Sequence, residues 1–86
     1  MSEKTLYLYT TLGCHLCEDA EKIMTECLSM DFFRIEKIEI ADSDDMIEKY
    51  GTRIPVIRLE SSSQDLGWPF DHQQLIDFLT EELEKH

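Results

Sequence analysis

Hydrophobic residues recur along this chain with two periods, one typical of strands and one typical of helices. Residues 4–9 alternate, with Leu6 and Leu8 on one side and Tyr7 and Tyr9 on the other. Both sides are apolar, which is typical of an interior strand that is covered on both faces. The alternation therefore predicts a first strand inside a sheet.

Residues 15–30 follow the helical period. Their apolar side chains recur at intervals of three and four residues, so they share one face of a helix. This stripe consists of Leu16, Ala20, Ile23, Met24, Cys27 and Leu28. We interpret Cys27 as a small buried hydrophobic residue of the stripe rather than as a redox group.

A second strand is predicted over residues 32–40. Its apolar residues change parity between Ile35 and Ile38, so a bulge near Glu36-Lys37 is expected to restore the phase. Because a helix separates this strand from the first, the two form a βαβ unit and should run parallel.

The second half of the chain carries shorter elements. A helix is predicted over 44–50, with Gly51 as its C′ residue, and the acidic residues of 42–45 are interpreted as caps rather than as a calcium site. Residues 52–59 and 65–68 are predicted to form two strands of a hairpin, joined by a serine-rich turn.

The last helix has the clearest start. Asp71 is placed to cap it, and Gln74 completes a capping box three residues later. Phe70 and Leu75 are placed for a hydrophobic staple. The apolar stripe of this helix consists of Leu75, Ile76, Leu79 and Leu83, with Phe78 at its edge. The residues expected to be solvated are Glu81, Glu82, Glu84, Lys85 and His86. The elements then follow the order β-α-β-α-β-β-α, which predicts an α/β protein.

Composition and charge narrow the class of protein. Its length predicts one domain over residues 1–86, and 42% hydrophobic content is that of a globular chain. A net charge of −11 argues against nucleic acids and anionic membrane surfaces as partners. No apolar run approaches the ~20 residues of a membrane span, and no signal peptide precedes the first strand. We therefore expect a cytoplasmic monomer.

Thiol chemistry is predicted in the stretch 10–17, between the first strand and the first helix. Cys14 and Cys17 stand at i and i+3 on a first helical turn, so they face each other and can form a short disulfide. The helix N-terminus favours a thiolate, and Gly13 permits a sharp turn into the helix. His15 would add positive charge when protonated, whereas the two acidic residues after the pair act against a thiolate.

Half of a zinc site is the alternative interpretation of the cysteine pair. Zinc needs about four ligands, and the remaining candidates are Cys27, His15, His72 and His86. Cys27 would lie about 20 Å from Cys14 along the same helix. A C-x-x-C motif near a βαβ unit is more typical of a redox pair, so no metal site is predicted.

A proline stands near the start of the third predicted strand. An X-Pro bond at Ile54-Pro55 is either an edge feature or a cis bond at a tight turn. A cis bond would leave the backbone groups of Ile54 free to pair with something outside the sheet.

In the order found here, these motifs resemble those of the glutaredoxin-like members of the thioredoxin fold. The resemblance is strongest to a small bacterial type with Gly-Cys-His-Leu-Cys near the N-terminus and Trp-Pro-Phe-Asp before the last helix, here Gly13–Cys17 and Trp68–Asp71. It covers nearly the whole chain. It implies a four-stranded mixed sheet flanked by three helices, with the first and third on one face and the second on the other. It also implies a cis Ile54-Pro55 bond beside the cysteine pair.

The resemblance further implies roles for these residues. Cys14 would be the exposed nucleophile and Cys17 the more buried resolving thiol, while the backbone of Ile54 would hold an extended substrate. The implied activity is thiol–disulfide exchange on a disulfide-containing protein or a small thiol compound. No tightly bound cofactor is implied, only an external thiol reductant.

Two departures argue against glutathione as that reductant. The glutathione-binding members carry a Gly-Gly before the last helix, where this chain has Gly67-Trp68, and a lysine before the active-site loop, which is absent here. Arg53 either replaces that lysine as the partner of the glycyl carboxylate of glutathione or is an exposed residue at a strand end. Trp68 either closes the end of the sheet or lies over the cysteine pair and shapes access to it.

The leading prediction is therefore a small thiol–disulfide oxidoreductase. Two alternatives stay open at the level of the sequence. One is a thioredoxin-fold binding module whose cysteines are not turned over. The other is a dimer that binds a metal or an iron–sulfur cluster by sharing two C-x-x-C pairs.

Overall fold

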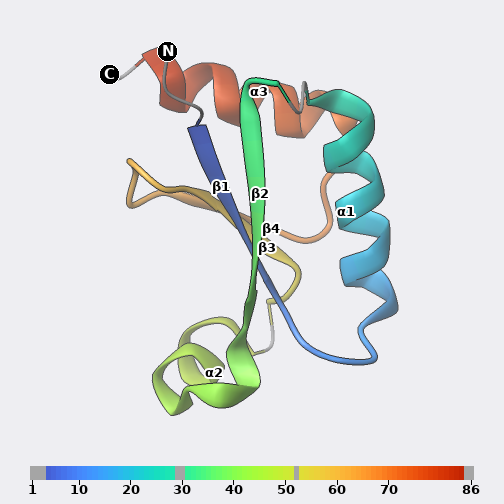
Figure 1. The fold of residues 1–86 in the computed structure, drawn as a ribbon, viewed down its shortest axis with the longest axis vertical. Helices are drawn as coiled ribbons and strands as arrows, with labels where there is room; N and C mark the ends of the chain where they lie inside the picture. The colour runs from blue at the N-terminus through green and yellow to red at the C-terminus, as the bar shows by residue number, and fades with distance from the viewer. Residues whose placement is uncertain (1–3, 29–30, 52, 85–86) are drawn as a thin grey trace.

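A four-stranded mixed sheet lies at the centre of the computed structural model, which describes residues 4–28, 31–51 and 53–84 (Figure 1). Its strands are β1 (Lys4–Thr10), β2 (Phe33–Glu39), β3 (Val56–Leu59) and β4 (Asp65–Gly67). They lie in the order β2-β1-β3-β4, with β1 parallel to β2 and antiparallel to β3, and with β3 antiparallel to β4. The predicted mixed sheet, parallel βαβ unit and final hairpin are confirmed.

The helices cover the two faces of the sheet unequally. Helices α1 (His15–Cys27) and α3 (His72–Glu84) pack on one face, and α2 (Asp44–Tyr50) packs on the other after the 3-10 turn η1 (Ile40–Asp42). Leu6 and Leu8 belong to the larger core, which α1 and α3 complete. Tyr9 belongs to a smaller core with Tyr50 of α2. The alternation in β1 thus feeds two cores, as predicted for a strand covered on both faces.

Strand β2 contains no bulge. It pairs with β1 over its full length in one unbroken register, so the bulge predicted near Glu36-Lys37 is wrong. Phe33 and Ile35 pack under α1 and α3, whereas Ile38 packs on the opposite face beside α2. The change of parity therefore reflects a change in which face is covered along the strand.

Helix α1 is shorter than predicted. It ends at Cys27, and Leu28 caps it in an extended conformation with φ −107° and ψ 141°. The rest of the predicted extension, residues 29–30, lies outside the described residues. Ala20 and Met24 are fully buried, but Leu16, in the first turn of the helix, is 47% exposed. The predicted stripe is therefore wrong at its N-terminal end.

Helix α2 has the predicted limits but a different end. Ser43 caps its N-terminus by accepting a hydrogen bond from the Met46 N–H at 3.3 Å. Gly51 directly follows the last helical residue, but it is the C-cap itself, with φ −53° in the ordinary helical region, and not the predicted C′ residue. A Cβ at Gly51 would collide with the carbonyl oxygen of Ile47, so the glycine is favoured here by space.

Helix α3 begins with the predicted capping box. The Asp71 N–H donates to Oε1 of Gln74 at 3.0 Å, and the Gln74 N–H donates to Oδ1 of Asp71 at 2.8 Å. Phe70 and Leu75 are both buried in the larger core, in agreement with a staple.

Two side chains of α3 differ from their predicted environments. Ile76 is exposed, whereas Glu82 is only 2% exposed and accepts a hydrogen bond from the Ser62 hydroxyl. Positions 75, 79 and 82 share one helical face, and Ile76 is rotated about 100° away from Leu75. Lys85 and His86 lie outside the described residues. Among the helices that the structure describes, none is long and apolar enough to span a bilayer.

Candidate active site

The loop after β1 delivers the cysteine pair to the start of α1. Gly13 has φ +79°, in the left-handed region that glycine adopts without steric cost. Cys14 follows as the N-cap of α1, and the first helical residue is His15. The predicted role of Gly13 in the turn is therefore confirmed.

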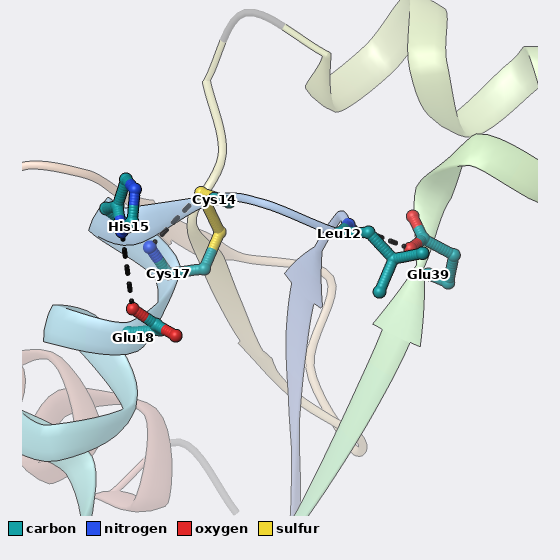
Figure 2. The surroundings of a disulfide bond; sticks show 6 residues. All are labelled: Leu12, Cys14, His15, Cys17, Glu18 and Glu39. Atoms are coloured by element: carbon teal, nitrogen blue, oxygen red, sulfur yellow. Dashed lines mark hydrogen bonds and ion pairs between the residues drawn. A yellow bond between two sulfur atoms is a disulfide. The ribbon is translucent and has the colours of Figure 1, made fainter.

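Cys14 and Cys17 are joined in a disulfide, with 5.3 Å between their Cα atoms (Figure 2). The two cysteines are unequally exposed: Cys17 is buried among the core residues of α1, whereas Cys14 is partly exposed. A group approaching from solvent therefore meets the sulfur of Cys14 first.

The sulfur of Cys14 lies in the positive end of the helix. It accepts a hydrogen bond from the Cys17 N–H at 3.1 Å. An N–H at a helix N-terminus has no partner within the helix and carries partial positive charge, so it stabilises a thiolate at this sulfur once the disulfide is reduced.

His15 turns toward Glu18 rather than toward the disulfide. Its Nδ1 lies 3.5 Å from the Glu18 carboxylate, and the two side chains are 93% and 77% exposed (Figure 2). An ion pair this exposed contributes little, because water and salt screen it. An effect of His15 on the cysteine pair stays a prediction.

Glu39, at the end of β2, anchors the loop that carries the cysteines. Its Oε1 accepts the Leu12 N–H at 3.1 Å, and its Oε2 accepts the Ala41 N–H at 3.0 Å. Hydrogen bonds, first from Ala41 and also from Thr11 and Leu12, hold the pKa of the Glu39 carboxyl below its usual range. The sequence reading missed this residue. The predicted parallel pairing could have identified it. Parallel strands end at the same edge of a sheet, so a carboxylate at the end of β2 lies beside the loop that follows β1.

A cleft of about 240 Å³ lies beside the disulfide. It is formed by the end of β1, the loop to Cys14, the first half of α1 and the end of β2. Its lining residues are Leu8, Thr10, Thr11, Leu12, Gly13, Cys14, Cys17, Glu18, Glu21, Lys37 and Glu39. Across it, the Lys37 ammonium pairs with the Glu21 carboxylate at 3.0 Å.

The Ile54-Pro55 peptide bond is cis, as the resemblance implies. Val56 pairs with Tyr9, so Pro55 stands at the end of the sheet from which the cysteine loop departs. The Ile54 N–H donates to the Tyr50 carbonyl at 3.0 Å, so the expectation that both backbone groups of Ile54 are free is wrong for the N–H. The last turn of α2 supplies this acceptor. The Trp68-Pro69 bond is also cis, which was not predicted.

Arg53 and Trp68 both have partners within the chain. The Arg53 guanidinium lies 2.5 Å from the Asp65 carboxylate and 6.0 Å from the centre of the Tyr50 ring. Trp68 is partly buried against the larger core and meets Phe70 edge to face, with 5.1 Å between ring centres. Of the two interpretations of Trp68, the structure supports closure of the core.

No metal site forms within residues 4–28, 31–51 and 53–84, where no three His, Cys, Asp or Glu side chains could hold one ion. Cys27 is a free thiol, half-buried against the larger core, with its Sγ 3.9 Å from the His72 carbonyl oxygen. Burial raises the pKa of this thiol, and the charge of Glu26 adds to the effect. Both observations agree with its interpretation as a core residue.

Comparison with known proteins places the chain in a family. Residues 5–80 match the glutaredoxin-like domain (DUF836). The chain is also similar to the X-ray structure of target protein XcR50 from X. campestris, at 30% identity and TM-score 0.77, over 88% of this chain and 96% of that one. Protein Ne2328 from Nitrosomonas europaea shares the fold at 22% identity and TM-score 0.68, over 91% of this chain and 93% of that one. Among curated proteins, none matches significantly. The family match over residues 5–80, together with the thioredoxin-like arrangement of the sheet and helices, shows that the chain belongs to the glutaredoxin-like domain family.

Proposed function

We propose that this protein is a thiol–disulfide oxidoreductase that cycles between a Cys14–Cys17 disulfide and the corresponding dithiol. One observation carries the proposal: two bonded cysteines at one helix N-terminus are unequally exposed. An accessible sulfur that accepts a helix N–H suits a nucleophile. A buried sulfur within bonding distance suits a resolving thiol.

The reaction proceeds in two exchanges. The Cys14 thiolate attacks one sulfur of a substrate disulfide, forms a mixed disulfide and releases the other substrate sulfur as a thiolate, which takes a proton from water. The Cys17 thiol then loses its proton and attacks the Cys14 sulfur, which releases the second substrate thiolate. The substrate gains two electrons, and the protein is left with the Cys14–Cys17 disulfide. An external thiol reductant restores the dithiol by the same exchanges in reverse.

We further propose that this reductant is not glutathione. The Arg53 guanidinium, the candidate partner for a glutathione carboxylate, is paired with Asp65. The Ile54 N–H, a candidate donor to an extended substrate, is paired with Tyr50. Neither group is available without first breaking a contact within the chain.

The proposal is tested by a redox titration read by thiol trapping and mass. We expect a reversible two-electron transition between roughly −270 and −180 mV, the range from thioredoxin to protein disulfide isomerase. Cys14→Ser should abolish disulfide reduction, Cys17→Ser should accumulate the mixed disulfide, and Cys27→Ser serves as the matched control that keeps full activity. Full activity of Cys14→Ser, or a pair that stays reduced in every buffer, would refute the proposal.

One observation favours a second candidate, a binding module whose cysteines are not turned over. The Ile54 N–H, which an extended substrate would need, is already paired with Tyr50. Alkylation of the reduced protein at neutral pH separates the two candidates. A Cys14 that reacts faster than the half-buried Cys27 supports the enzyme, and a Cys14 no faster than Cys27 supports the binding module.

A further inference from the structure

The cleft beside the disulfide has two features that the exchange reaction does not use. Leu12, at its rim, is 92% exposed. The cleft is also lined by three carboxylates, those of Glu18, Glu21 and Glu39, against the single ammonium of Lys37. Together these features describe what kind of chain segment could lie there.

Backbone hydrogen bonds and the turn at Gly13 fix the loop that carries the exposed Leu12. Its N–H is bonded to Glu39, whose second oxygen is bonded to Ala41, and Gly13 turns the chain immediately afterwards. Figure 2 shows Leu12 and Glu39 together at the ends of the two parallel strands, with the disulfide at the other end of the loop. A leucine held open to water on an anchored loop is suited to contact with another apolar surface.

Leu16 is a second exposed apolar residue near Cys14 in the chain. It lies in the first turn of α1, two residues after Cys14, and is 47% exposed. Leu12 lies two residues before Cys14, so exposed leucines stand on both sides of it in the chain. A small hydrophilic disulfide would leave both side chains in water, whereas a folded or extended peptide segment could cover them.

The negative charge of the cleft determines which side-chain charge a docked segment should carry. Lys37 is paired with Glu21 at 3.0 Å, which leaves the carboxylates of Glu18 and Glu39 as the excess negative charge among the lining residues. His15 lies 3.5 Å from Glu18 and offsets its charge only when the imidazole is protonated. Glu39 accepts backbone hydrogen bonds, which leave its negative charge in place. A basic side chain is complementary to this wall, and an acidic one is repelled by it.

We propose that the cleft docks a disulfide-bonded protein segment whose reactive cysteine is flanked by a basic and an apolar residue. The basic side chain lies toward Glu18 and Glu39, and the apolar side chain covers Leu12 and Leu16. This inference rests on the proposed function, because docking matters only if Cys14 attacks the bound cysteine.

The test uses short peptides whose single cysteine carries a 2-nitro-5-thiobenzoate group in disulfide linkage. Attack by the Cys14 thiolate on the peptide sulfur forms a Cys14–peptide disulfide and releases the coloured nitrothiobenzoate thiolate. Cys17 then displaces the peptide as a thiol, so the protein is oxidised as the probe is reduced. Three peptides are compared, with Leu-Cys-Lys, Leu-Cys-Glu and Ser-Cys-Lys at their centres, and each rate is divided by that of dithiothreitol on the same peptide.

The parent protein should favour the Leu-Cys-Lys peptide over the Leu-Cys-Glu peptide by roughly five- to tenfold at low salt. This ratio should fall to about twofold or less in 1 M NaCl, where the screening length is only about 3 Å. The salt series needs no variant, so it does not depend on whether any substitution folds.

Two pairs of variants separate charge from apolar contact. Glu18→Gln should lower the preference for lysine, Lys37→Gln should raise it, and Glu48→Gln on α2 is the control that leaves it unchanged. Leu12→Ser should slow the leucine peptides by roughly three- to tenfold and leave the Ser-Cys-Lys peptide nearly unaffected, as expected for loss of one leucine contact. Ile47→Ser, at another exposed apolar position on α2, is its control.

The outcomes distinguish the docking inference from the proposed function. Equal normalised rates on all three peptides would overturn the docking inference while the oxidoreductase assignment stands. No release of nitrothiobenzoate from any peptide would overturn both. A preference for glutamate over lysine would also overturn the inference, since it would reverse the sign of the charge in the cleft.

Discussion

Replacing Gly13 by alanine tests whether backbone conformation alone dictates the residue before the reactive cysteine. Nothing lies within 4 Å of the position that an added Cβ would occupy, so the substitution creates no collision. The residue has φ +79°, however, and an L-residue in the left-handed region costs roughly 1–2 kcal/mol. A less flexible unfolded chain offsets about 0.4–1 kcal/mol of this cost. The expected net loss in the free energy of unfolding is about 1 kcal/mol.

The assay is equilibrium unfolding in urea, with the disulfide kept oxidised. For a domain of this size, a loss of about 1 kcal/mol lowers the thermal midpoint by roughly 4–8 °C, and the urea midpoint falls in proportion. Gly13→Asn should lose about half as much, because asparagine tolerates the left-handed region better than alanine.

Gly67→Ala is the matched control. Its φ is not positive, and an added Cβ would make only ordinary contacts, the nearest at 3.6 Å from the Arg53 guanidinium. This control should be neutral or slightly stabilising. The reasoning is refuted if Gly13→Ala is as stable as the parent, or if the Gly67 variant is the less stable of the two.

Three further predictions concern the core, a helix cap and the loop anchor. Met24→Ala should lose roughly 2–5 kcal/mol of unfolding free energy because the Met24 side chain is fully buried. Leu16→Ala should change the unfolding free energy by no more than about 0.5 kcal/mol. Equal losses of the two variants in urea unfolding would contradict the different burial of Met24 and Leu16. Asp71→Ala should lose about 1 kcal/mol, and a double-mutant cycle with Gln74→Ala should give a coupling energy, since the two residues exchange hydrogen bonds. Folding lowers the pKa of Glu39, so the contribution of this carboxylate to stability is present above the normal glutamate range and is lost as pH falls through the folded-state pKa. The urea midpoint of the parent should therefore drop below pH ~4.3, and this drop should be smaller in Glu39→Gln. An equal drop in both proteins would contradict the role of Glu39 as the loop anchor.

The elements that depend on a few neighbouring residues could be predicted from the sequence. Helix α2 has the predicted limits, and the capping box at Asp71 and Gln74 closes with both hydrogen bonds. Alternation in β1 predicted which side chains enter which core. In each case the interaction acts within about four residues, so its signal is written in the local pattern.

The errors lie where burial depends on what another element covers. A helical stripe shows which side chains share a face, but not how far the sheet reaches along that face. Leu16 therefore lies in water at the start of α1, and Glu82 is buried beside Ser62, a residue of the turn before β4. The change of parity in β2 likewise needed the positions of α1 and α2 to be interpreted.

The candidate site was predictable only in part. Motif order identified the cysteine pair and Gly13, and the resemblance supplied the cis Ile54-Pro55 bond. Glu39 and the paired Ile54 N–H could not be reached in this way, because one depends on the register of β1 with β2 and the other on the last turn of α2.

The order of strands also has a consequence for how copies of this chain meet at high concentration. β2 is an outer strand of seven residues, and a long outer strand offers its free backbone groups to a second sheet. Exposed charges of both signs, on Arg34, Glu36 and Lys37, interrupt that edge. The other outer strand, β4, has only three residues and offers little length for pairing. The two outer strands thus disfavour fibrillar association of the chain, and this protection does not depend on the chemistry of the cysteines.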